Sequence, residues 1–208
     1  TALVKKSEAA DTLKQIHEVM PAIIQETGVV LRFLCAFRRI PLTIIKDHIT
    51  ENQFTENLQG LAAVAKDPYV AGSDLVGEEI NDIRDLKGLI HQILTIAKND
   101  PGYVLRIHAG ENDSLKDNVL HTVKCIEDGL EKDQFFPHVR IGHGLYTANL
   151  KSSKGKELLA LLKRKKVVLE FQITSNVRLN NLSELKHHPL KQYLLEGIDC
   201  IQGTDGGA

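Results

Sequence analysis

The sequence predicts an α/β fold in which strands and helices alternate to build one parallel sheet. Short runs rich in Val, Ile and Leu, typical of strands buried on both faces, recur along the chain. Amphipathic stretches with apolar residues at helical spacing separate these runs. Such regular alternation favours either an open, doubly wound sheet or a closed eight-stranded barrel.

Six strands are expected, and the pattern places them at Val29–Phe37, Tyr69–Asp74, Tyr103–His108, Val139–His143, Val167–Ile173 and Ile198–Thr204. Helices are expected at Ser7–Glu26, Leu42–Ala65, Ile80–Ala97, Asp113–Gly129, Lys156–Arg164 and Leu182–Glu196. Proline and glycine fall at the joints, and no linker or repeat divides residues 1–208, which we expect to form a single domain. Six units are too few for the usual barrel, which takes about 250 residues. The pattern alone therefore leaves an open sheet and part of a barrel both possible, and the chain is expected to begin and end within the pattern.

The composition is that of an ordinary globular protein and argues against some classes of binding partner. Lys and Arg (26) balance Asp and Glu (27), which argues against a nucleic-acid-binding surface, and the basic run Lys163–Lys166 reads as a solvated helix end. No apolar run approaches the ~20 residues that span a bilayer. The three cysteines form no C-x-x-C, which excludes a cysteine zinc site and fits a reduced compartment. We expect a cytoplasmic location, with a signal peptide before Thr1 left open.

Polar residues follow five of the six expected strands. The chemically useful ones are His108, Glu111, His143 and Asp205, joined by a Glu170…Asn176 segment that could be part of a site or merely support it. In a parallel barrel the carboxyl ends of the strands share one rim, where chemistry collects. Alone, each His is more often a structural residue, and an Asp after a strand often caps the next helix. Together, imidazole and carboxylate groups on one rim match a hydrolytic zinc site with an open position for water.

In this order the motifs resemble the adenosine deaminase family. The resemblance rests on His108-Ala-Gly-Glu111, Arg140-Ile-Gly-His143-Gly144, the Glu…Ser-Asn segment and Thr204-Asp205. Asp74-Leu-Val-Gly77-Glu78 resembles the family's Asp-Leu-Ala-Gly motif, and Leu34-Cys35…Arg38 its third strand. The similarity covers nearly the whole chain and implies a TIM-type (β/α)8 barrel, of which strands three to eight are present.

The resemblance implies a zinc-dependent purine deaminase that converts adenosine, or a related 6-aminopurine, to inosine and ammonia. His108 and Asp205 would be ligands of a single zinc ion. Protonated Glu111 would donate to N1 of the purine, and His143 would orient and polarise the zinc-activated water that attacks C6. Gly77 would donate its backbone N–H to purine N3. The implied partner is thus a small purine nucleoside, with neither nucleic acid nor membrane involved.

Three departures from the family pattern matter. The family's first strand carries H-x-H, which supplies two zinc ligands, and no two histidines here are two residues apart. Gly206 stands where the family usually has a second Asp, and Phe171-Gln172 replaces a common Cys-Pro. Either the chain is a fragment, its missing strands supplied by a longer chain or by self-association, or it is a truncated relative without catalysis.

Three functions therefore stay open. The first is the purine deaminase above; the second is a catalytically inactive fragment or purine-binding pseudoenzyme. The third is a deaminase for AMP or adenine, although no phosphate cradle of the P-loop kind is visible. The histidines outside the motifs are given no role: His17, His48, His91, His121, His138, His187 and His188.

Overall fold

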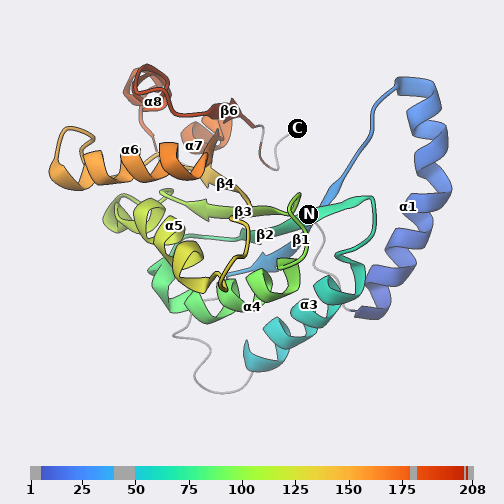
Figure 1. The fold of residues 1–208 in the computed structure, drawn as a ribbon. Coiled ribbons are helices and arrows are strands. Elements are labelled where there is room, and N and C mark those ends of the chain that lie inside the picture. Colours follow the sequence, from blue (N-terminus) through green and yellow to red (C-terminus); the bar gives the residue numbers. More distant parts are fainter. Residues whose placement is uncertain (1–5, 40–49, 179–181, 204, 206–208) are drawn as a thin grey trace.

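The computed structural model describes residues 6–39, 50–178, 182–203 and 205, and its centre is one six-stranded parallel sheet (Figure 1). The strands are β1 (Phe33–Arg38), β2 (Val70–Val76), β3 (Val104–Ala109), β4 (His138–His143), β5 (Val168–Phe171) and β6 (Cys200–Gln202). They lie in the order β1-β2-β3-β4-β5-β6. A doubly wound sheet would reverse its strand order at a switch point, whereas consecutive order is that of a (β/α) barrel. The prediction of a partial barrel is confirmed.

The helices are α1 (Lys6–Thr27), α3 (Thr50–Val64), α4 (Lys87–Ala97), α5 (Asn118–Gly129), α6 (Ser153–Lys165), α7 (Ile173–Arg178) and α8 (Leu190–Leu195). Short 3₁₀ turns add Ile83–Leu86, Asp113–Leu115 and Leu185–His187. Consecutive helices pack against each other, α3 on α4, α4 on α5 and α5 on α6, as they do in the outer layer of a barrel (Figure 1). No described helix is long and apolar enough to cross a membrane.

The two faces of the sheet differ in polarity. Residues on the helix-covered face are apolar and fully buried, for example Leu75, Leu105, Ile107, Ile141 and Leu169. The alternate residues, which point to the other face, include the charged set Asp74, Arg106, His108, Arg140 and Glu170. Asp74, His108 and Glu170 are nevertheless buried, as expected for strands buried on both faces, whereas Arg106 and Arg140 are half-buried.

Several predicted boundaries also differ. The first strand begins at Phe33 rather than Val29, because β1 pairs with β2 only from Phe33 onward, and Val29, Val30 and Leu31 are exposed. The fifth strand ends at Phe171, since Asn176 N donates to Gln172 O and the chain turns into α7. The sixth strand is shorter than expected, at Cys200–Gln202.

The predicted helices are also divided. A 3₁₀ turn precedes α4 and α5, and another turn separates α8 from the start of the expected 182–196 helix. The basic run behaves as predicted, since Lys163, Arg164 and Lys165 form the last turn of α6 and Lys166 caps it in the left-handed region. The start of the expected Leu42–Ala65 helix, up to residue 49, lies outside the described residues.

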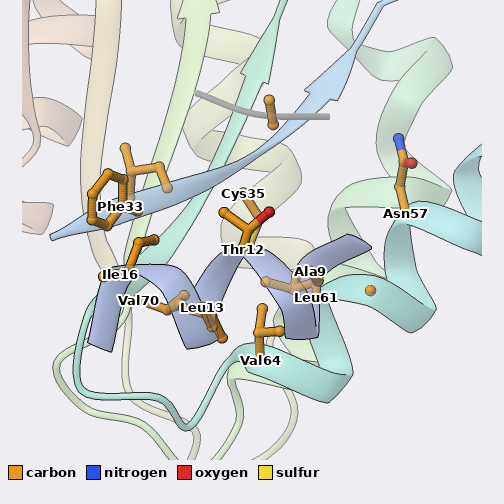
Figure 2. A pocket seen from close by; sticks show the side chains of 13 residues that line it. Ala9, Thr12, Leu13, Ile16, Phe33, Cys35, Asn57, Leu61, Val64 and Val70 are labelled. Atoms are coloured by element: carbon orange, nitrogen blue, oxygen red, sulfur yellow. The ribbon is translucent and has the colours of Figure 1, made fainter. Parts of the chain in front are cut away.

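An apolar pocket of about 70 Å³ lies between α1, α3 and the edge strand β1 (Figure 2). Leu13 and Ile16 of α1, Leu61 of α3 and Phe33 and Cys35 of β1 are among its lining residues. Burial raises the pKa of the Cys35 thiol to about 11. The pocket lacks the acid, base and metal-ligand groups that the sequence predicts for the site, so the candidate site must lie elsewhere.

Candidate active site

Three predicted site residues meet where β3 and β4 end. His108 lies in β3, Glu111 follows that strand, and His143 is the last residue of β4. Each offers a ligand atom, and these atoms all lie within 4.8 Å of one another. The rings of His108 and His143 meet edge to face, with centroids 5.0 Å apart. The register places Ala109 beside His143, so the two histidines stand at the ends of adjacent strands.

His143 is held by α7. Its Nδ1 atom lies 2.9 Å from Oδ1 of Asn176, and both side chains are buried. An amide oxygen can only accept, so Nδ1 carries the proton and Nε2 keeps its lone pair. Burial lowers the pKa of His143, although the neighbouring Glu111 carboxylate acts in the opposite direction. The neutral imidazole therefore presents Nε2 toward Glu111, whose Oε1 lies 3.6 Å away.

The backbone at His143 is in the left-handed region, with φ of 73°. A non-glycine residue there is uncommon and must be held by its surroundings. The next residue, Gly144, donates its N–H to Ala109 O at 2.9 Å, which fixes the turn against β3. The turn breaks the strand alternation and is consistent with a side chain directed toward Asn176 and Glu111.

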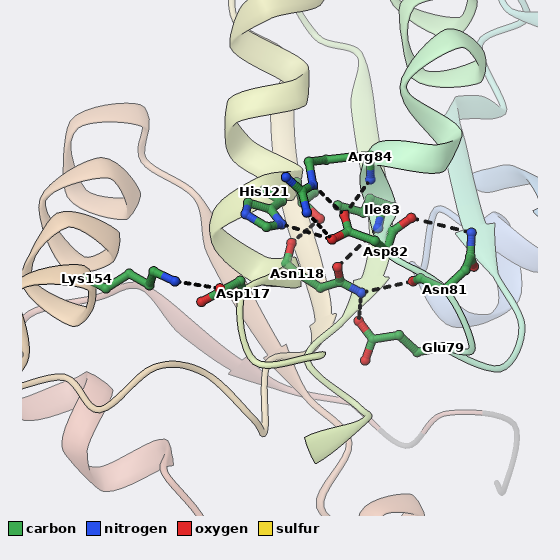
Figure 3. Close-up of polar contacts among 10 residues, drawn as sticks. Glu79, Asn81, Asp82, Ile83, Arg84, Asp117, Asn118, His121 and Lys154 are labelled. Atoms are coloured by element: carbon green, nitrogen blue, oxygen red, sulfur yellow. Dashed lines mark hydrogen bonds and ion pairs between the residues drawn. The ribbon is translucent and has the colours of Figure 1, made fainter. Parts of the chain in front are cut away.

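Glu111 is positioned by a buried carboxylate that precedes it by 32 residues. Glu79 accepts from three consecutive backbone N–H groups, those of Gly110, Glu111 and Asn112, at 2.9, 2.6 and 2.7 Å. Asn118 Nδ2 donates to the same carboxylate at 2.8 Å, as Figure 3 shows. Asn118 also accepts from Ile83 N at 3.1 Å. Glu79 thus ties the loop after β3 to α5 and to the segment after β2.

Two glycines have steric reasons to be glycine. Gly110 has φ of 78°, and a Cβ there would lie 2.9 Å from Tyr146 O and 2.9 Å from Val119 Cγ2. Gly77, the predicted donor to the purine, has φ of 100°, and its Cβ would lie 3.2 Å from Arg39 O. Both positions favour glycine for the backbone alone. The predicted contact between Gly77 and purine N3 stays a prediction.

A layer of charges lies on the sheet face below His108. Arg106 Nη1 lies 2.7 Å from Asp74 Oδ2, and Arg106 Nε lies 3.1 Å from Glu170 Oε2. Arg140 Nη2 and Gln172 Nε2 also donate to Glu170, each at 3.0 Å. Glu170 therefore serves as an acceptor for three side chains, and Asn176 supports His143. The sequence left open whether Glu170 and Asn176 are part of the site or only support it. Their contacts in the structure are supporting ones.

Asp205 is exposed and has φ of 58°. Its charge acts on His143, where it favours the protonated form, but it is not a member of the group formed by His108, Glu111 and His143. Its role as a metal ligand stays a prediction. Gly206 and Thr204 lie outside the described residues.

The donor set suits a divalent cation. Imidazole and carboxylate are the ligands that hydrolytic zinc sites use. Asp74 adds a buried oxygen, because its Oδ1 has no hydrogen-bond partner among the described residues and lies 3.6 Å from Nε2 of His108. A buried oxygen without a donor is unfavourable unless a ligand or ion satisfies it. The residues therefore fit a metal. His108 belongs both to the group with Glu111 and His143 and to the pair with Asp74.

The family model for adenosine deaminase matches residues 6–208. The chain belongs to the adenosine deaminase family. Among curated relatives, the adenosine deaminase of Lactococcus lactis is 29% identical over 140 residues, which cover 67% of this chain and 34% of the relative. That of Clostridium kluyveri is 32% identical over 136 residues, 65% of this chain and 33% of the relative. The chain thus spans about a third of the length of these family members.

Solved structures show the same fold. The adenine deaminase of Arthrobacter aurescens superposes with a TM-score of 0.60 at 22% identity, covering 91% of this chain and 49% of that one. The N6-methyl-AMP deaminase of Arabidopsis thaliana gives 0.59 at 21% identity, covering 84% and 42%. These likenesses extend over most of the chain and confirm the barrel assignment.

Sequence reasoning missed Glu79 and Arg106. Arg106 carried a usable signal, since a charge within a buried apolar strand needs a partner, and Arg106 and His108 share one face. Glu79 carried no comparable signal, because it follows the strand among other acidic residues and its contacts depend on the fold of a loop far along the chain.

Proposed function

We propose that this chain carries the catalytic rim of a zinc-dependent purine aminohydrolase. The reaction converts adenosine, or a related 6-aminopurine, and water into the 6-oxopurine and ammonia. One observation supports it above the others: His108, Glu111 and His143 present their ligand atoms within 4.8 Å of one another at the ends of two adjacent strands. Membership of the adenosine deaminase family supports the same chemistry.

His108 and Asp205 would hold the zinc ion, with Asp74 Oδ1 close to the same nitrogen of His108. A bound zinc ion would supply Lewis acidity and make water a better nucleophile near neutral pH. Asp205 is exposed, and its charge already acts on His143.

Glu111 would supply a proton. Its carboxyl group, when protonated, would donate to N1 of the purine as water adds to C6, which keeps negative charge from building on the ring. The loop that carries Glu111 is fixed by three backbone hydrogen bonds to Glu79, so the carboxyl group is held in place before substrate arrives.

His143 would accept a proton. Its Nε2 atom keeps a lone pair because Asn176 engages Nδ1, and burial keeps the ring neutral. Nε2 would take one proton from the attacking water and return it to the departing amino group, which leaves C6 as ammonia. The second water proton, left on the C6 hydroxyl, would return to the Glu111 carboxylate as the C6–O bond becomes a carbonyl, while N1 keeps the proton that Glu111 donated. Gly77 would donate its N–H to purine N3.

The test is ammonia release by the longest natural form of this chain, with zinc, from adenosine, adenine and AMP in parallel. We expect adenosine, or one of the other two 6-aminopurines, to be deaminated. The structural likeness to enzymes described as adenine deaminase and N6-methyl-AMP deaminase is the reason to include a base and a nucleotide. No deamination of any of the three would contradict the proposal and favour a purine-binding protein without catalysis.

The Glu111→Gln variant tests the proton-donor role of Glu111 separately from metal binding. Glu111→Gln should lower kcat by about 100-fold or more, because the amide cannot donate a carboxylic proton. Zinc content should stay at one ion per chain. Near-full activity of this variant would contradict the proton-donor role while leaving the metal assignment intact.

A further inference from the structure

Arg106 contacts the ring nitrogen that a metal would need. It lies two residues before His108 on β3, so both side chains point to the same face of the sheet. Arg106 Nη1 lies 2.8 Å from His108 Nε2. A guanidinium group has donors only, so Nε2 must be the acceptor, and its lone pair points at the guanidinium.

The guanidinium is held from two sides. Nη1 also lies 2.7 Å from Asp74 Oδ2, while Nε and Nη2 lie 3.1 and 3.0 Å from the two oxygens of Glu170. The Arg106 side chain is only 12% exposed. A planar group with several charge-assisted hydrogen bonds keeps its orientation, and arginine stays protonated in proteins. A fixed positive charge therefore sits directly on His108.

A metal and this guanidinium cannot share the position. Zinc binds an imidazole nitrogen at about 2.0–2.1 Å along the lone pair, well inside the 2.8 Å that separates Nη1 from Nε2. Two positive charges at such separations also repel strongly in a partly buried site. Withdrawal of Arg106 would leave two metal donors 3.6 Å apart, His108 Nε2 and Asp74 Oδ1, and the latter has no hydrogen-bond partner in the described part of the chain.

We propose that Arg106 competes with the metal for His108: a divalent cation binds only when it displaces the guanidinium, so that Arg106 sets the metal affinity of the site. This inference rests on the proposed function, because it takes His108 as a metal ligand. Asp74 then has two states, paired with Arg106 before the metal binds and facing the metal afterwards.

Zinc and cobalt(II) titrations of the full chain by calorimetry test the proposal. Arg106→Gln removes the charge but keeps a polar side chain that can bond to Asp74 and Glu170. It should bind either metal about tenfold or more tightly than the unmodified chain, because the competing charge is gone. Arg140→Gln is the matched control, since Arg140 bonds to the same Glu170 at 3.0 Å. The β4 residue paired with His108 is Gly142 rather than Arg140. Its affinity should stay close to that of the unmodified chain.

Affinity of Arg106→Gln equal to or weaker than that of the unmodified chain would overturn the inference while leaving the proposed function standing. If neither the unmodified chain nor the variant binds zinc or cobalt, the metal step of the proposed function fails as well. An equal gain in Arg140→Gln would also overturn the inference, because the effect would then come from loosening Glu170.

A second measurement uses the unmodified chain and therefore does not depend on the folding of a variant. Phenylglyoxal labels accessible arginines, and peptide mass spectrometry reports each site separately. Cobalt at saturation should raise the labelling of Arg106 several-fold, since displacement breaks its contacts, while the more exposed Arg140 serves as the internal reference. Labelling of Arg106 that is unchanged or reduced by the metal would contradict displacement.

Discussion

Asn176 Oδ1 lies 2.9 Å from Nδ1 of His143 and fixes the tautomer of a buried ring. Asn176 lies on α7, which begins at Ile173, the last residue of the strand expected from the sequence, and its amide contacts the residue that ends β4. The hydrogen bond leaves Nε2 as the acceptor in the site. Residues that orient a reactive imidazole in this way contribute without touching the substrate.

Replacement of Asn176 by alanine should lower kcat by about 10- to 100-fold with a smaller effect on KM, because the ring loses its fixed orientation. Steady-state ammonia release by the longest natural form of the chain measures this. Thr174→Ala, on the same helix and exposed, is the control and should keep its activity. A similar loss in both variants would mean that α7 itself had been disturbed.

Glu79→Gln should destabilise the fold by about 2–4 kcal/mol. The amide replaces one of two oxygens that accept four donors, and at least one buried N–H then lacks a partner. Urea unfolding followed by circular dichroism measures the free energy. The neighbouring Glu78 is exposed, so Glu78→Gln should change stability little. Equal effects of the two substitutions would show that the Glu79 hydrogen bonds are not stabilising.

Gly110→Ala should cost about 2–4 kcal/mol of unfolding free energy. Its Cβ would lie 2.9 Å from the backbone oxygen of Tyr146, at a φ of 78° that alanine disfavours. Gly88→Ala is the opposite case, because Gly88 lies exposed in α4 and no atom of the described residues would come within 4 Å of a Cβ there. It should stabilise by about 0.5–1 kcal/mol. Thermal unfolding of the two variants gives the sign of each effect, and a stabilising Gly110→Ala would contradict the structure of this turn.

Stability should fall at alkaline pH. Burial raises the pKa of the Cys35 thiol from 9.0 to about 11, so the folded chain holds a proton that the unfolded chain releases. A raised pKa gives stability that is present below pH 9 and lost as pH rises toward 11. Urea unfolding at pH 8 and pH 10.5 should show the loss, and Cys35→Ala should make it smaller. An unchanged pH dependence in Cys35→Ala would exclude this thiol as a cause.

The sequence predicts much of the fold because its signals are local. Runs such as Val139–His143 are short and apolar, and Pro68 and Pro101 lie just before β2 and β3. The positions of His108, Glu111 and His143 at strand ends place them on one rim, and the family resemblance singles them out as candidates. Local signals fail at α7, where three polar residues fit a strand end or a first helical turn equally well, and the hydrogen bond from Asn176 N to Gln172 O selects the helix.

The supporting contacts could not be predicted, because they depend on register between strands. Asp74, Arg106 and Arg140 become lateral neighbours only when β2, β3 and β4 pair as they do. The bonds from the Gly110–Asn112 loop to Glu79 likewise join segments more than thirty residues apart. These contacts show how the rim residues are positioned, whereas the sequence pattern identifies only which residues are candidates.

Zinc content per chain, measured by elemental analysis after equilibration with zinc and gel filtration, tests the central claim most directly. The unmodified chain and the control His187→Ala, which alters an exposed histidine of a 3₁₀ turn, should each retain one zinc ion. His108→Ala should retain little, because the ligand common to every arrangement of the site is lost. Equal zinc in His108→Ala and the unmodified chain would contradict a metal centre at the ends of β3 and β4.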